Sequence, residues 1–169
     1  PTYVKAAFEY AYDELKKQNV QNKVTLFYND YDTYFSVDDE LALISYINEG
    51  EEAKICGGIG MQSHVDIKRP TLEEYGNALK AFINAGLEVQ ITELDITINF
   101  DTDDTDGRTP TYAYKNEKET DADQAAFTKD FIKQIVDIQK NRDKTISPKG
   151  ITGITVWGIS DQTSWRGSC

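Results

Sequence analysis

Two carboxylates placed two residues apart have the clearest chemical potential in this sequence. Glu93 and Asp95 lie within an otherwise apolar run, residues 89–96, where a carboxylate without partners costs several kcal/mol. Side chains of a strand alternate between its two faces, so both acids are expected on one face. They form either a nucleophilic carboxylate with a supporting acid or a structural pair satisfied by backbone donors or arginine. Spacing alone leaves both interpretations open.

His64 is the only histidine of the chain and lies beside Gln62, just past a predicted strand. A lone histidine is more often structural than catalytic, but this position favours a cleft. One histidine with scattered carboxylates offers no recognisable metal-ligand set, so we expect no metal and no cofactor. The acidic run at residues 101–107 fails the EF-hand spacing and is interpreted as a solvated loop.

Aromatic side chains accompany these polar groups. Trp157 and Trp165 are the only tryptophans, and both follow the last predicted strand. Tyr31 and Tyr34 follow the first predicted strand. Each of the four either packs in the core or presents a flat platform on which the apolar face of a sugar ring can stack.

The elements that must position these residues alternate between helix and strand. Periodicity predicts helices over residues 2–18, 41–50, 71–86 and 126–138, and short apolar strands over 24–28, 56–61, 87–96 and 151–157. Thr71 and Glu74 form a capping box, and Gly86 closes that helix. Residues 97–121 form a polar stretch that is too long for an idle connection.

This alternation predicts an α/β fold with a parallel sheet and right-handed crossovers. Four strands make either a small open sheet or half of an eight-stranded barrel. The glycines at residues 57–60 lack the G-x-G-x-x-G spacing and precede no helix, so a nucleotide-binding fold is excluded. We predict the half barrel, whose chemistry lies at the carboxyl ends of its strands.

The composition restricts the possible partners. A net charge of −11 over 169 residues repels nucleic acid and anionic membranes, but not a neutral polysaccharide. No apolar run is long enough for a transmembrane helix, and the opening Pro-Thr-Tyr-Val-Lys carries no targeting signal. Cys56 and Cys169 lack metal-site spacing; a single bridge between them and two separate thiols both stay open.

Four segments resemble glycoside hydrolase family 10, the barrel xylanases, in order and with compatible spacing across nearly the whole chain. They are LFYNDY at 26–31, GIGMQSHVD at 58–66, LEVQITELDI at 87–96 and ITVWGISDQTSW at 154–165. The resemblance implies that the strands are the fifth to eighth of a (β/α)₈ TIM barrel. Residues 1–169 would then be a partial catalytic domain, with the N-terminal half not in this chain.

The resemblance also implies roles for individual residues. Glu93 matches the family's nucleophile, His64 the histidine that hydrogen-bonds it, and Asp95 the carboxylate that holds that histidine. The residues that match the substrate cleft and its sugar subsites are Asn29, Tyr31, Gln62, Trp157 and Trp165. The implied reaction is hydrolysis of internal bonds of β-1,4-xylan with retention of configuration.

One expected part is absent from the chain. Family members carry the general acid/base in an Asn-Glu pair upstream of everything present here, so we expect the isolated chain to be inactive and to need an N-terminal half, on the same or a separate chain. Activity without it would require Asp30, Asp66 or Asp161 as the acid. The alternatives are a non-catalytic carbohydrate-binding fragment and a related β-1,4-glycanase. Secretion is expected because xylan does not enter cells.

Overall fold

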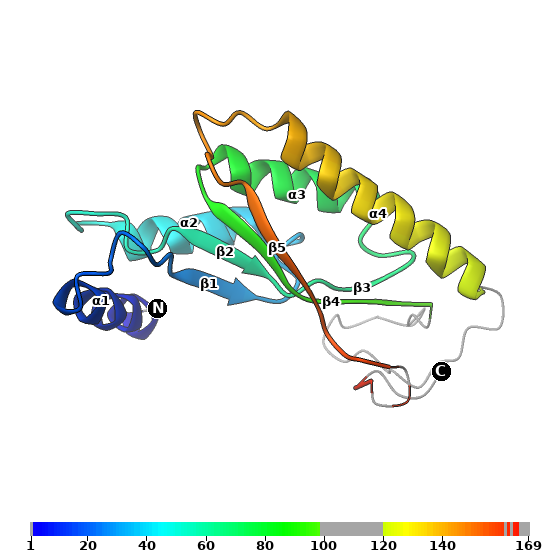
Figure 1. The fold of residues 1–169 in the computed structure, drawn as a ribbon, viewed down its shortest axis with the longest axis horizontal. Coiled ribbons are helices and arrows are strands. Elements are labelled where there is room, and N and C mark those ends of the chain that lie inside the picture. Colours follow the sequence, from blue (N-terminus) through cyan, green and yellow to red (C-terminus); the bar gives the residue numbers. More distant parts are fainter. Residues whose placement is uncertain (1, 99–119, 161, 163, 166–169) are drawn as a thin grey trace.

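The structure, a computed structural model, describes residues 2–98, 120–160, 162, 164 and 165. Helices and strands alternate along the chain, as the sequence predicts (Figure 1). The helices are α1 (Thr2–Lys17), α2 (Val37–Asn48), α3 (Leu72–Asn84) and α4 (Asp121–Asn141), and the strands are β1 (Phe27–Asp30), β2 (Gly58–Met61), β3 (His64–Asp66), β4 (Glu88–Thr97) and β5 (Ile151–Val156).

All strand pairs of the sheet are parallel. β1 pairs with β2, β2 and then β3 pair with successive parts of β4, and β5 also pairs with β4. β2 and β3 therefore act as one interrupted strand, and four strand positions follow one another in chain order. This arrangement is that of a partial (β/α)₈ barrel, as predicted.

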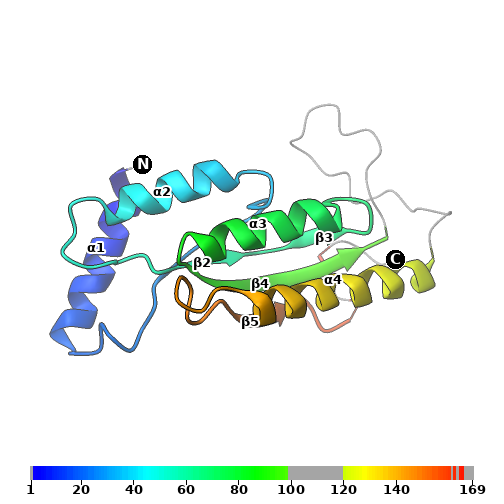
Figure 2. The same ribbon diagram turned by 90° about the horizontal axis from the view of Figure 1, so that it is seen from above.

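Three helices cover one face of the sheet. α2, α3 and α4 lie side by side over it, whereas α1 lies at the end of the molecule near β1 (Figures 1 and 2). The core lies between these layers; its largest members include Ile47 from α2, Phe82 from α3, Phe131 from α4, and Ile59 and Ile91 from the sheet. Burying each such side chain contributes about 1.5–3 kcal/mol.

Helix α3 forms where the sequence predicts it. Thr71 accepts a hydrogen bond from the Glu74 amide, and the Glu74 side chain accepts one from the Thr71 amide, which completes the capping box. Gly86 follows the helix with φ of 74°, a left-handed conformation that glycine adopts without strain. The helix thus begins and ends through local signals.

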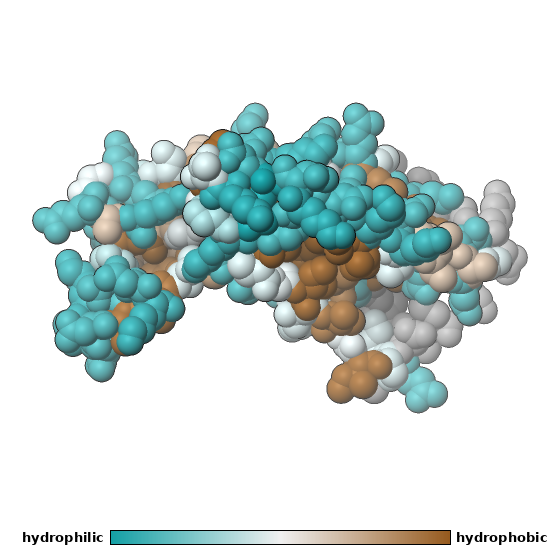
Figure 3. Space-filling view, turned by 45° about the horizontal axis from the view of Figure 1, so that its top comes forward, coloured by the Kyte–Doolittle hydropathy of each residue, from teal (hydrophilic) through white to brown (hydrophobic). Residues whose placement is uncertain are grey.

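The face of the sheet away from the helices is largely uncovered by the described residues. In Figure 3, apolar side chains emerge beneath the hydrophilic helix layer. Ile154, Val156 and Ile159, in and just after β5, are exposed. Among the described strands, β1 and β5 each have one partner, so both edges of the sheet are open. Of the helices described, none combines the length and apolarity needed to cross a bilayer.

Some details differ from the prediction. The first strand begins at Phe27 rather than residue 24 and ends at Asp30, so Asn29 belongs to the strand itself. β3 was not predicted as a separate strand. Cys56 is a buried free thiol. Cys169, Asp161 and the acidic run at residues 101–107 lie outside the described residues.

Candidate active site

A bulge in β4 sets the direction of the two carboxylates. Met61 pairs with Ile91, and His64 pairs with Asp95. Between these pairs, three residues of β4 (residues 92–94) face two residues of the segment that links β2 to β3 (residues 62 and 63). A bulge of this kind shifts the alternation of side chains by one position. Glu93 and Asp95 consequently leave the buried face of Val89 and Ile91 and lie together on the face that carries the site.

His64 lies between the two acids. Its Nε2 atom is 3.3 Å from Glu93 Oε2, and its Nδ1 atom is 3.0 Å from Asp95 Oδ2. The side chains of His64, Glu93 and Asp95 are 16%, 19% and 14% exposed, so the group is shielded but open to a ligand. A neutral imidazole donates from one nitrogen and the cation from both. The structure thus brings together the three residues that the sequence singled out.

Asn29 contacts the other oxygen of Glu93. Its Nδ2 donates to Glu93 Oε1 at 3.5 Å, and its Oδ1 accepts from Thr92 Oγ1 at 2.6 Å. The Thr92 bond fixes the amide so that its NH₂ faces the carboxylate. Gly60 makes room for this contact, because a Cβ there would lie 2.3 Å from Asn29 Oδ1. Each oxygen of Glu93 therefore has a side-chain nitrogen beside it, Asn29 Nδ2 at Oε1 and His64 Nε2 at Oε2.

The sequence alone does not single out Thr92 as a site residue. Strict alternation places it on the opposite face from Glu93, and only the bulge allows both side chains to approach Asn29. Its sole sequence signal is a polar residue directly before Glu93 in an apolar strand.

The two tryptophans line the site. Trp165 Nε1 donates to Asp95 Oδ2 at 2.7 Å, and the Trp165 ring lies 4.9 Å from the His64 ring. The Trp157 ring lies 6.3 Å from His64. Trp157 and Trp165 are 48% and 45% exposed, so neither is a core residue. Their exposed surfaces are available for stacking with a flat apolar ligand face.

The remaining predicted residues lie at the same strand ends. The Gln62 amide donates to the Asp30 carbonyl at 3.0 Å, and Tyr31, which follows Asp30, is exposed. Within the described residues, neither the Tyr31 nor the Gln62 side chain hydrogen-bonds to the acids or to His64. Tyr34 is buried, and its hydroxyl lies 3.3 Å from the His64 carbonyl oxygen. For Tyr34, the core interpretation is the right one.

Two of the alternative acids are engaged in local structure. Asp30 accepts hydrogen bonds from the Tyr28 hydroxyl at 2.6 Å and the Tyr31 amide at 2.8 Å. Asp66 Oδ1 accepts from two backbone amides, those of Lys68 and Arg69, at 2.6 and 2.7 Å. Both carboxylates therefore stabilise the turns that follow their strands.

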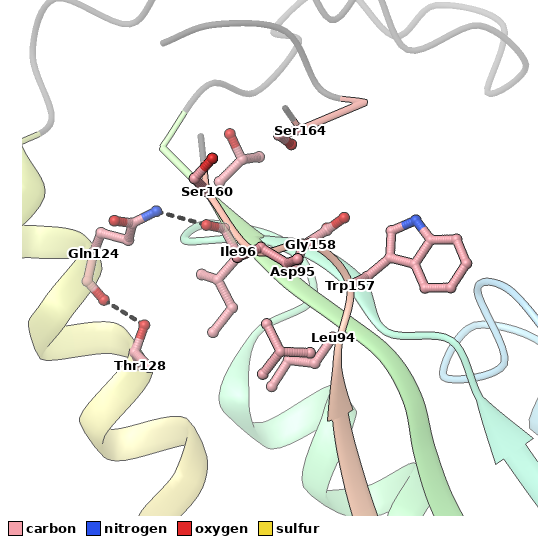
Figure 4. Close-up of a pocket in the computed structure, with 12 residues that line it drawn as sticks. Leu94, Asp95, Ile96, Gln124, Thr128, Trp157, Gly158, Ser160 and Ser164 are labelled. Atoms are coloured by element: carbon pink, nitrogen blue, oxygen red, sulfur yellow. Dashed lines mark hydrogen bonds between the residues drawn. The ribbon is translucent and has the colours of Figure 1, made fainter. Parts of the chain in front are cut away.

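A pocket of about 340 Å³ adjoins the site. Figure 4 shows it between the ends of β4 and β5 and the start of α4, with Asp95 and Trp157 in its wall. Gln124 Nε2 donates to the Ile96 carbonyl at 2.6 Å across this space. Within the described part of the chain, no group of three His, Cys, Asp or Glu residues is placed to hold a metal ion.

Comparisons with known proteins agree on one family. The family model described as Glycosyl hydrolase family 10 matches residues 1–169. The chain is 42% identical to endo-1,4-beta-xylanase A of Butyrivibrio fibrisolvens over 96% of its length and 33% of that protein's. It is 31% identical to endo-1,4-beta-xylanase A of Xylanibacter ruminicola over 98% of its length and 44% of that protein's.

Solved structures give the same result for the fold. The endo-1,4-beta-D-xylanase 10B of Clostridium thermocellum, solved with xylohexaose, matches 99% of this chain and 28% of that chain, with a TM-score of 0.73 and 29% identity. A catalytic core of xylanase A matches 98% of this chain and 46% of that chain, with a TM-score of 0.70 and 24% identity. The chain therefore spans less than half the length of these relatives.

Proposed function

The chain belongs to glycosyl hydrolase family 10, and on that premise we propose that it is the nucleophile-bearing half of a retaining endo-1,4-β-xylanase. Residues 1–169 form part of one catalytic domain. The observation that carries this proposal is the placement of His64 between Glu93 and Asp95 at the carboxyl ends of parallel strands. A partly shielded carboxylate with oriented donors suits covalent catalysis on a neutral sugar.

Glu93 attacks the anomeric carbon of the sugar and forms a covalent glycosyl-enzyme. Retaining glycosidases use two carboxyl groups about 5–5.5 Å apart, one as nucleophile and one as acid and then base. The acid protonates the leaving oxygen, then deprotonates the water that releases Glu93. The donors at Asn29 and His64 keep the carboxylate oriented during both steps, and Asp95 and Trp165 hold the ring of His64 from its other side.

The acid/base comes from the N-terminal half of the barrel, on the same or a separate chain. The open edges of the sheet support the proposal of a second half. In a closed barrel every strand pairs on both sides, whereas β1 and β5 each pair on one side only among the described strands. The engagement of Asp30 and Asp66 in turns also favours an acid from elsewhere. Alone, the chain is expected to be inactive and prone to aggregation.

The substrate is β-1,4-xylan, which binds along the exposed tryptophans. Support comes from the half-exposed faces of Trp157 and Trp165 beside the reacting carboxylate. Xylan lies outside cells, so we propose that the protein is secreted; activity that stays with washed cells rather than the medium would count against this.

The test is reconstitution of a complete barrel. The chain is joined to the N-terminal half of the Butyrivibrio fibrisolvens xylanase A, and reducing-sugar release is measured on xylan and cellulose. We expect turnover on xylan that Glu93→Ala abolishes. Turnover near the parental rate in Glu93→Ala would refute the nucleophile. Faster cellulose cleavage would favour a related glycanase, and calorimetric xylohexaose binding without hydrolysis would favour a carbohydrate-binding fragment.

A further inference from the structure

We propose that Ser63 and Tyr75 are positioning residues for the nucleophile, because their buried hydrogen bond fixes a backbone kink at Ser63, between β2 and β3, that directs His64 toward Glu93. This inference rests on the proposed function of Glu93. Neither residue touches the reacting atoms; both act through the backbone that carries His64.

Ser63 has a backbone conformation that residues other than glycine rarely adopt. Its φ is 66°, in the left-handed region where a Cβ meets the following carbonyl oxygen. Ser63 separates β2 from β3 and lies opposite the bulge of β4. A return of Ser63 to ordinary extended backbone would change the register of the following residue and turn the His64 ring away from its partners.

A buried pair of hydroxyl groups holds this conformation. Ser63 Oγ lies 2.7 Å from Tyr75 Oη and donates to the Met61 carbonyl at 3.1 Å. Because the serine proton is used there, Tyr75 donates to Ser63. Ser63 and Tyr75 are 1% and 0% exposed, so water cannot replace either bond. Burial raises the pKa of the Tyr75 phenol above its ordinary value, which keeps it a neutral donor.

The support for this kink comes from the helix layer. Tyr75 belongs to α3, and its ring lies 4.4 Å from that of Phe131 on α4 and 5.7 Å from that of Tyr34. The Tyr34 hydroxyl in turn lies 3.3 Å from the carbonyl oxygen of His64. The peptide that carries the histidine is therefore held from behind the sheet by packed aromatic residues.

The kink also sets a direct contact with the nucleophile's backbone. The Glu93 amide donates to the Gln62 carbonyl at 3.0 Å, and the Asp95 amide approaches the Ser63 carbonyl at 3.4 Å. A movement of Ser63 would thus change both the backbone and the imidazole that locate Glu93. A small misplacement of a reacting group lowers the rate of the chemical step more than it lowers binding.

The experiment uses the reconstituted barrel and a 2-deoxy-2-fluoro xylobioside with a good leaving group, which traps the nucleophile covalently. Tyr75→Phe and Ser63→Ala are expected to lower the first-order labelling rate about tenfold, with inhibitor affinity within about twofold. Ser147→Ala is the matched control. Ser147 is equally buried and has two hydrogen bonds, to the Leu87 carbonyl and from the Gly150 amide, but it lies at the other end of β4.

Ser63→Gly separates the kink from the hydroxyl. Glycine adopts positive φ freely, so the Ser63→Gly variant should be labelled at Glu93 faster than the Ser63→Ala variant. If Ser63→Ala does not fold, Tyr75→Phe carries the test, because it keeps the packed ring. Labelling of Glu93 in both variants at wild-type rate, or an equal loss in Ser147→Ala, would overturn the positioning role and leave the nucleophile intact. Labelling of a different carboxylate in the parent barrel would overturn the proposed function instead.

Discussion

Replacing Gly60 with alanine tests whether Asn29 orients Glu93. The added Cβ would lie 2.3 Å from Asn29 Oδ1 and 3.0 Å from its Cγ, well inside van der Waals contact. Rotation of the exposed Asn29 side chain relieves the contacts of its Oδ1 and Cγ, and a shift of a few tenths of an ångström relieves the 3.1 Å contact of its Cβ. That rotation breaks its bonds to Thr92 and Glu93, so the change should affect catalysis more than folding.

The magnitude follows from the bond that is lost. A hydrogen bond to a charged group is worth about 1.5–3 kcal/mol, and the 3.5 Å separation of Asn29 Nδ2 from Glu93 Oε1 places this contact at the weak end. A loss of about 1.4 kcal/mol corresponds to about tenfold in rate. Gly60→Ala should therefore lower kcat/KM on an aryl xylobioside about tenfold, with a free energy of unfolding reduced by less than about 1 kcal/mol.

The assay compares Gly60→Ala with Gly153→Ala and with Asn29→Ala in the complete barrel. Gly153 is the matched control, because a Cβ there would meet Gln90 at an ordinary 3.8 Å. If Gly60→Ala lowers kcat/KM by displacing Asn29, the same substitution should lower kcat/KM little further in an Asn29→Ala background. An undiminished kcat/KM in Gly60→Ala, or a full additional tenfold loss in the double variant, would refute this reasoning.

Three further outcomes are expected. Burial alone would raise the pKa of Glu88, but hydrogen bonds from Lys149 and two threonines outweigh burial and leave the pKa below its ordinary value. The stabilisation that Glu88 contributes to the fold is therefore present above its pKa in the unfolded chain and is lost as the pH falls through its pKa in the folded protein. Thermal melts should show Glu88→Gln less stable than wild type at pH 7 and equal to it at the acid end, and an equal deficit at every pH would contradict this. Burial raises the pKa of the Cys56 thiol to about 11, so a thiol reagent at pH 8 should modify it only after unfolding; rapid reaction of folded protein would show it to be accessible. Trp165→Phe keeps an aromatic ring but removes the bond to Asp95, and should lower kcat/KM severalfold; a change in KM alone would assign the indole to sugar binding.

The sequence predicts features that depend on neighbouring residues. The capping box at Thr71 and the glycine at the end of α3 act within one turn of helix, so their spacing is visible in the chain. The convergence of His64, Glu93 and Asp95 was likewise accessible, because parallel strands bring their carboxyl ends to one edge.

Other features depend on how strands pair and were not accessible. The bulge is a difference in register, seen both between β4 and the segment that contains Gln62 and Ser63 and between β4 and β5, and it has no counterpart in the sequence pattern. The positive φ of Ser63 carries no sequence signal comparable to a glycine. For the same reason, the contacts of Thr92 with Asn29 and of Tyr75 with Ser63 could not be assigned before the strands were aligned.

The two open edges of the sheet have a consequence for measurement. If the nucleophile and the acid reside in different halves, sugar release occurs only in the associated species. Titration of one half with the other would then turn catalytic rate into an association curve. With the fixed half held well below the dissociation constant of the two halves, the midpoint would equal that constant, with the substrate serving as the reporter.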